Sequence, residues 1–162
     1  DVGVVGVKLL YPDETIQHAG IMVGAYGSAG NVGVNLPRSA SGYAKRFMCA
    51  SNLSAVSASV MMVKRSVFNE VDGFDERFKV SCHDVDFCLK VNKAGYRVVY
   101  NGDIEFYHQE NATSGHTLID EQLLRAERER AFLHYRWPHY FIEGDPYFSA
   151  CFDGESPYFR LS

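Results

Sequence analysis

The sequence predicts one α/β domain over residues 1–162, because segments with strand patterns alternate with segments of helical pattern. Of the 162 residues, 46% are hydrophobic and 22% charged. This length suits a single compact domain, and this composition excludes a mainly disordered chain. The formal net charge of -4 argues against a nucleic-acid partner, which would favour a basic face. No run approaches the ~18 consecutive apolar residues of a membrane-spanning helix, so no transmembrane segment is expected.

The first strand is expected at residues 2–10, which are β-branched and apolar throughout, as in a central strand. Because this run starts at the second residue, with no initiator Met or leader, we expect a piece of a longer protein. Residues 11–14 have turn composition, and residues 16–23 are expected to return as the second strand of a hairpin.

A long mobile loop is predicted at residues 24–42. Glycine occupies every third position from 24 to 33, with small and polar residues between, so the segment is expected to bury little surface. A phosphate-binding loop is the sharper alternative. It is disfavoured because no Lys-Ser/Thr pair follows the glycines.

Several shorter elements follow. A strand is expected at 55–63, and a short helix at 67–71 that Asp72-Gly73 closes. Strands at 97–100 and 104–108 are separated by an Asn101-Gly102 turn. A helix at 118–135 and an irregular aromatic tail at 138–162 complete the chain. The four cysteines (Cys49, Cys82, Cys88 and Cys151) form no C-x-x-C pair, which indicates small buried side chains in a reducing compartment.

Residues 81–95 carry the clearest helical pattern. Ser81 and Asp84 have the spacing of a capping box, and Gly95 is a typical stop. An apolar stripe of Val85, Cys88 and Leu89 predicts the buried face. Acidic residues lie in the first turn and lysines near the end, as the helix dipole favours.

Three clusters could carry chemistry: Gln17-His18-Ala19-Gly20, the pair Asp84 and Asp86, and His108 with Glu110, Thr113 and Ser114. On a helix, residues two apart point about 200° apart, so the two aspartates cannot share one site. Both are first-turn acids in the simpler interpretation, and His108 is then a satisfied polar residue at a strand end. Spacing alone does not select a function.

Five segments, at 7–20, 71–76, 83–90, 94–100 and 107–113, resemble in order the C-terminal half of family 2 glycosyltransferases. The sequences are VKLLYPDETIQHAG, VDGFDE, HDVDFCLK, AGYRVVY and YHQENAT. The likeness is strongest to the bacterial polysaccharide and rhamnosyl-type branch. It implies a partial GT-A fold: the acceptor-side half of a Rossmann-like nucleotide-sugar transferase, with a mixed sheet and flanking helices.

The resemblance also implies roles for particular residues. Asp84 matches the family's catalytic base, and His83 stands where Glu or Asn is usual. Ser57, Ala58 and Ser59 match a Thr-Gly-Ala segment on the substrate side. His108 lies where related enzymes place a metal ligand. A divalent metal, Mn²⁺ or Mg²⁺, is thus implied for the full-length enzyme, whose Asp-x-Asp motif would precede residue 1, and this fragment is not expected to hold it firmly.

The function implied is inverting transfer of a sugar from a nucleotide-sugar donor to a glycan or lipid-linked acceptor, in the cytoplasm or at the inner membrane face. One carboxylate would remove the acceptor proton during a single displacement. The isolated chain is expected to be inactive and to self-associate through an exposed sheet edge. The alternative is a non-catalytic carbohydrate-binding or regulatory module, in which Tyr147, Phe148, Tyr158 and Phe159 would stack on sugars.

Overall fold

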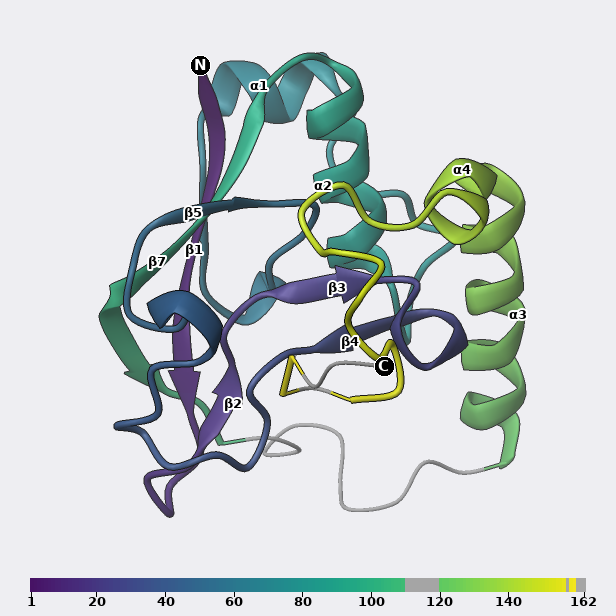
Figure 1. The fold of residues 1–162 in the computed structure, drawn as a ribbon. Helices are drawn as coiled ribbons and strands as arrows, with labels where there is room; N and C mark the ends of the chain where they lie inside the picture. The colour runs from purple at the N-terminus through teal and green to yellow at the C-terminus, as the bar shows by residue number, and fades with distance from the viewer. Residues whose placement is uncertain (110–119, 157, 160–162) are drawn as a thin grey trace.

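The computed structural model describes residues 1–109, 120–156 and 158–159, and it confirms the mixed α/β class (Figure 1). One sheet has five strands in the order β2-β1-β7-β5, with β6 also paired to β1, and a second sheet contains β3 and β4. The strands are β1 Val2–Leu10, β2 Ile16–His18, β3 Ile21–Val23, β4 Ala29–Asn31, β5 Ser51–Leu53, β6 Met61–Val63 and β7 Arg97–Tyr107. The helices are α1 Arg65–Glu70, α2 His83–Lys93, α3 Asp120–Arg136 and α4 Pro138–Ile142.

Strand β1 is central, as its composition predicts. It pairs in parallel with β7 on one side, and antiparallel with β2 and β6 on the other. Both edges of β1 are therefore paired within the chain. Self-association through an exposed sheet edge stays a prediction. The side chain of Met62, on β6, is 76% exposed.

The expected strand at 16–23 is instead two short strands in different sheets. β2 pairs with β1, whereas β3 pairs with β4. The chain bends at Gly20, whose φ of 109° is in the left-handed region, and a Cβ there would lie 2.3 Å from Cδ1 of Leu53. Only glycine permits this bend against the core.

The interpretation of residues 24–42 as a loop that buries little is wrong for its first part. Residues 29–31 form β4, and Ala25 and Val32 are 2% and 3% exposed. The glycines allow tight bends, since Gly24, Gly27 and Gly33 all have left-handed φ. Those bends fold the segment back onto β3.

The predicted strand at 55–63 is confirmed only over its last three residues, which form β6, and is wrong for residues 55–60. β5 ends at Leu53 and pairs with β7, whereas β6 begins at Met61 and pairs with β1 on its opposite side. Because the chain must cross from one edge of this sheet region to the other, residues 54–60 cannot be a strand of the same sheet. They hold the buried Val56 and a 3₁₀ turn at Ala58–Val60.

Two strands that the sequence separates are one. β7 continues through Asn101-Gly102, and the register shifts there, with Val7 opposite Asn101 but Lys8 opposite Glu105. The expected turn is therefore a bulge within β7. A Cβ on Gly102 would lie 2.4 Å from the carbonyl oxygen of Phe47, which explains the glycine.

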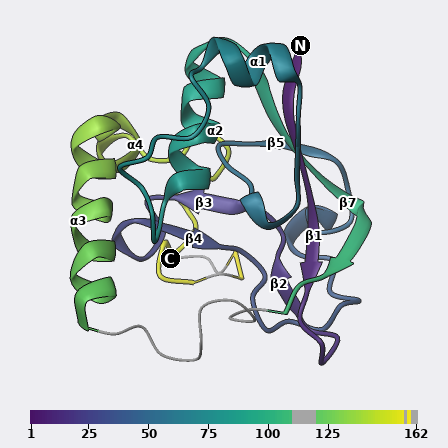
Figure 2. The same ribbon diagram turned by 180° about the vertical axis from the view of Figure 1, so that it is seen from behind.

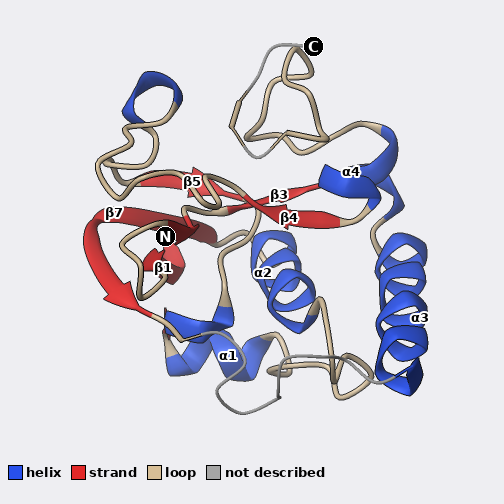
Figure 3. Cartoon of the chain, turned by 90° about the horizontal axis from the view of Figure 1, so that it is seen from below, coloured by secondary structure: helices blue, strands red, loops and turns tan. Residues whose placement is uncertain are grey.

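Helix α2 packs against β1 and β7, and α3 stands on the far side of α2 from the large sheet (Figures 2 and 3). Val85, Cys88 and Leu89 are buried, as the apolar stripe predicts. Helix α3 is confirmed over its described length, while residues 118 and 119 lie outside the described residues. Within the described segments, no helix combines the length and apolar character needed to cross a membrane.

The tail is more ordered than expected. It contains α4, and the rings of Phe148 and Phe159 stack 5.4 Å apart and are each 9% exposed. These two aromatics are packing residues and are not available to stack on a sugar. None of the four cysteines, all of which lie within the described residues, forms a disulfide, but Cys49 and Cys151 are exposed where burial was predicted.

Candidate catalytic site at the start of helix α2

Asp84 lies in the first turn of α2, after an irregular helix start. The N-cap is Cys82, with a left-handed φ of 61° and no side-chain capping bond. The predicted capping box does not form, because Ser81 is engaged by Glu129 of α3, 2.7 Å from the Ser81 amide nitrogen. Asp84 instead accepts a hydrogen bond from the Val85 amide at its own Oδ1, 2.9 Å away.

The other carboxylate oxygen of Asp84 contacts the turn that follows β5. The amide of Ala58 donates to Asp84 Oδ2 over 3.3 Å. Asp84 is half-buried, so its carboxylate is held by main-chain donors and still reaches the surface. The structure thus brings together Asp84 and Ala58, which are 26 residues apart in the sequence.

The turn at Ser57-Ala58-Ser59 is fixed from within and from β2. The Ser57 hydroxyl accepts a hydrogen bond from the Ser59 amide at 3.2 Å. The Ser57 amide donates to Nε2 of His18 at 3.3 Å. These contacts orient the Ala58 amide toward Asp84.

His18 is the buried support of this turn, with 1% of its surface exposed. Because Nε2 accepts from Ser57, Nδ1 carries the proton and donates to the Asn31 side-chain oxygen at 2.8 Å. Burial lowers the pKa of His18, and the Asn31 bond and the Asp84 charge only partly oppose this. His18 is therefore neutral near pH 7 and acts as a fixed hydrogen-bond acceptor.

His108 lies just beyond β7 and contacts Gln17 of β2, the residue next to His18. Its Nδ1 is 2.8 Å from Oε1 of Gln17, so Nδ1 carries the proton and Nε2 keeps its lone pair. This is the tautomer of a metal-ligating histidine oriented by a second residue. Across the described ranges, however, no three His, Cys, Asp or Glu side chains cluster as a metal site. His108 could offer one ligand and no more. Glu110, Thr113 and Ser114, expected near it, lie outside the described residues.

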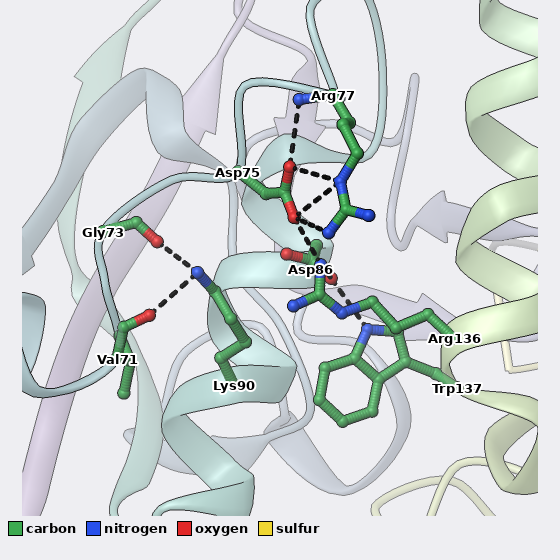
Figure 4. A network of polar contacts seen from close by, with 8 residues as sticks. All are labelled: Val71, Gly73, Asp75, Arg77, Asp86, Lys90, Arg136 and Trp137. Atoms are coloured by element: carbon green, nitrogen blue, oxygen red, sulfur yellow. Dashed lines mark hydrogen bonds and ion pairs between the residues drawn. The ribbon is translucent and has the colours of Figure 1, made fainter.

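Asp86 lies inside the protein, beside Arg136 and Trp137 (Figure 4). It is fully buried, its Oδ1 accepts a hydrogen bond from Nε1 of Trp137 at 2.8 Å, and Nη1 of Arg136 lies 3.3 Å from the same atom. Burial raises the pKa of Asp86, while the Trp137 bond and the Arg136 charge oppose the shift. The interpretation of both aspartates as simple first-turn acids is therefore wrong for Asp86, which joins α2 to the end of α3.

The network around Asp86 continues to the loop before α2. Arg136 also bonds Asp75, at 2.6 Å, and Arg77 contacts both oxygens of that carboxylate (Figure 4). The Arg77 bonds hold the pKa of Asp75 well below its usual range. Lys90 of α2 donates to the carbonyl of Val71 at 2.9 Å. These contacts attach the loop to both helices.

The structure brings some of the predicted site residues together and leaves others apart. Asp84, Ser57 and Ala58 meet around one point, and Ser59 closes the turn. The first residue of α2, His83, packs edge-on against Phe74, with ring centroids 5.9 Å apart. His108 is linked to the site only through neighbouring residues of β2.

Sequence reasoning assigned no role to His18, Asn31 or Glu129. His18 stood in a singled-out cluster, but nothing local shows that its partner is Asn31, in the glycine-rich segment. Glu129 had a detectable signal. It lies three residues after Ala126 and four before Leu133, which places it on the same helical face as these two apolar residues, so an acid at a core position of the pattern could have drawn attention.

Comparison with known proteins supplies three informative relatives. The chain is 42% identical over 137 residues to the uncharacterized protein y4gI of Sinorhizobium fredii, which covers 84% of this chain and 15% of that protein. It is 37% identical over 151 residues to the O-antigen biosynthesis protein RfbC of Myxococcus xanthus, covering 92% of this chain and 11% of that protein. Over 60 residues it is 38% identical to the N-acetylglucosaminyl-diphospho-decaprenol L-rhamnosyltransferase of Mycobacterium tuberculosis, covering 37% of this chain and 20% of that enzyme.

The chain therefore spans about a seventh of y4gI and about a ninth of RfbC. No family model matches it, and no solved structure is significantly similar. What the comparisons establish is a glycosyltransferase-like character, since one of these relatives is named for O-antigen biosynthesis and another for L-rhamnosyl transfer.

Proposed function

We propose that this chain is the acceptor-side part of a glycosyltransferase of polysaccharide synthesis, with Asp84 as the catalytic base. One contact carries the proposal: the Ala58 amide donates to the Asp84 carboxylate at 3.3 Å, so two segments that the resemblance assigns to the acceptor side, 26 residues apart in the sequence, touch each other. The names of the relatives RfbC and the L-rhamnosyltransferase support the same class.

The chemistry suits a single base. A sugar hydroxyl attacks well only if its proton is removed as the bond forms, and a positioned carboxylate contributes about 10²- to 10⁴-fold in rate. A half-buried carboxylate whose two oxygens each accept one main-chain amide fits that role, because each oxygen keeps a further lone pair. One displacement without an enzyme nucleophile inverts the anomeric carbon.

A glycoside hydrolase is disfavoured by the same geometry. Hydrolases of the common type use two carboxylates that flank the scissile bond. The neighbouring Asp86 is fully buried and bonded to Trp137, so it cannot face a substrate together with Asp84.

The remaining parts of the proposal concern groups beyond the described residues. The GT-A assignment places the nucleotide-sugar site, and most ligands of a divalent cation, in a preceding segment. His108 would add one ligand through Nε2, and a bound Mn²⁺ or Mg²⁺ would offset the charge of the departing diphosphate. A lipid-linked acceptor, as in the name of the Mycobacterium tuberculosis relative, would place the enzyme at the inner membrane face.

The test is a transfer assay on the intact protein that contains this chain, with nucleotide-activated L-rhamnose and N-acetylglucosaminyl-diphospho-polyprenol as probes and other nucleotide sugars as alternative donors. We expect transfer with inverted anomeric configuration, read by NMR of the product. The 162-residue chain alone should show none.

The competing function is a carbohydrate-binding module. Glycan binding by the 162-residue chain in calorimetry, together with no transfer by the intact protein from any donor in the panel, would establish that alternative. A product with retained configuration would also contradict the single-base mechanism.

A further inference from the structure

Glu129 is a buried acid whose carboxylate binds main-chain amides of residues 79–81. It lies in the middle of α3 and is 4% exposed. Its carboxylate accepts hydrogen bonds from three successive amides: Lys79 at 3.0 Å, Val80 at 3.0 Å and Ser81 at 2.7 Å. Three amides converging on one carboxylate form an anion-binding concavity, filled here by the protein's own side chain.

The segment that Glu129 holds leads directly into the candidate site. Ser81 precedes Cys82, which has the left-handed φ of 61°, and α2 begins at the next residue with Asp84 in its first turn. No side chain caps α2, and the bonds of Glu129 to the three amides of residues 79–81 hold the segment that leads into this helix end. Asp84 lies three residues beyond the last amide that Glu129 holds.

The contacts keep Glu129 ionised. Burial pulls the pKa of Glu129 upward, but the amide bonds of Lys79, Ser81 and Val80, aided by Arg125, outweigh it and lower the pKa. Arg125 lies one helical turn earlier, with its Nε 3.0 Å from Oε1. A charge withdrawn from water is costly unless it is fully hydrogen-bonded, so this position is specialised for holding the loop.

We propose that Glu129 is a positioning residue for Asp84, an inference that rests on the proposed function. It sets the path of residues 79–81 and thereby the placement of the α2 terminus against the Ala58 amide. Misplacing a catalytic group by about 1 Å costs up to about 100-fold in rate, so the expected loss of kcat is about 10- to 100-fold.

The structural step can be tested on the 162-residue chain by amide hydrogen exchange. Glu129→Gln keeps the size of the side chain but replaces one accepting oxygen with an NH₂ group, which cannot accept a hydrogen bond from the main-chain amides. The amide hydrogens of residues 79–81 and 83–86 should therefore exchange faster. Glu127→Gln is the matched control, since it removes the same charge from an exposed position of the same helix. Unchanged exchange at both segments in Glu129→Gln would overturn the proposal.

The functional step is tested in the intact enzyme by a double-mutant cycle. Glu129→Gln should lower kcat per folded molecule by about 10- to 100-fold and leave the donor KM within about twofold. Added to Asp84→Asn, it should cause almost no further loss, because it acts through that carboxylate. A purely structural Glu129 would give the same fold-loss in both backgrounds, and that result would overturn the inference.

Two outcomes separate this inference from the proposed function. If Asp84→Asn alone keeps normal turnover, the proposed function fails. If Asp84→Asn is inactive but Glu129→Gln is normal, only the positioning role fails. Should Glu129→Gln not fold, Glu129→Asp retains the charge on a shorter stem. It should give a smaller loss of kcat that also vanishes in the Asp84→Asn background, and an unchanged kcat would count against the role.

Discussion

Helix α2 carries two aspartates, two residues apart, whose surroundings are opposite. Asp84 is half-buried and held by the amides of Ala58 and Val85. Asp86 is fully buried and held by the side chains of Trp137 and Arg136. Main-chain donors hold the Asp84 carboxylate near the surface, whereas the side-chain donors that bind Asp86 attach α2 to the end of α3.

The difference teaches that the residue type is a poor guide to its role on this helix. The 200° separation on the helix decides which acid can meet a substrate and which must serve the fold. Glu129 repeats the lesson on α3, where a buried acid binds three amides while the exposed Glu127 lies two residues earlier.

The largest expected difference in stability is between Asp86→Ala and Asp84→Ala. Losing Asp86 leaves Trp137 Nε1 without its acceptor and removes one of the two carboxylates that contact Arg136. We therefore expect a loss of about 3 kcal/mol in the free energy of unfolding. Asp84→Ala should cost less than about 1 kcal/mol, since a half-exposed group with main-chain donors is replaced by water. Urea unfolding of the 162-residue chain measures both. Equal losses would remove the distinction between the two faces.

The second prediction concerns the support beneath Asp84. His18→Leu leaves the Ser57 amide without its acceptor, and burial of an unsatisfied donor costs about 1–3 kcal/mol. His18→Gln places an oxygen near the position of Nε2 and should recover at least half of that loss. If the two variants unfold at the same urea concentration, the His18–Ser57 bond does not stabilise the turn.

A smaller effect is expected in the pH dependence. In the folded chain the pKa of His18 lies below its ordinary value of 6.5, because the ring is buried. Between these two pKa values, only the unfolded chain takes up a proton on His18 as the pH falls. Stability should therefore decrease below about pH 6.5, by at most about 1.4 kcal/mol per pH unit, until the folded pKa is reached. In His18→Gln this slope should be absent, and an identical slope in both proteins would assign it to other groups.

Asp86 should act in the opposite sense at lower pH. Its folded pKa is raised above the ordinary value of 3.8, so the folded state binds the proton more readily. Stability should therefore fall as the pH rises through the folded pKa. Asp86→Asn should remove this contribution to the pH dependence of stability. When the free energy of unfolding is measured from pH 3 upward, the curves of the parent chain and of Asp86→Asn should converge toward the acid end. Parallel curves would show that Asp86 keeps an ordinary pKa.

Local patterns predicted the elements whose signals are self-contained. β1 is apolar throughout, and α2 has both its buried stripe and its stop at Gly95. The wrong predictions fall where contacts with residues distant in the sequence determine the local structure. Gly20 splits a predicted strand because of Leu53, and the capping box at Ser81 fails because Glu129, 48 residues later, binds that amide.

The candidate site was predicted in part for the same reason. The resemblance places Asp84 and the turn at 57–59 on one side, but it does not show that they touch. Their contact depends on His18 and Asn31, which lie in β2 and β4. Pairing between those strands and their neighbours is a tertiary property, and no periodicity in the sequence encodes it.

The most direct measurement compares Asp84→Asn with Asp86→Asn in the intact enzyme, with kcat expressed per folded molecule. If Asp84 is the base, its amide variant should bind the donor normally and lose at least about 100-fold in kcat. Asp86→Asn should retain turnover within about threefold, since Asn can still accept from Trp137. Comparable losses in both variants, or near-normal kcat in Asp84→Asn, would contradict the assignment of Asp84 as the base.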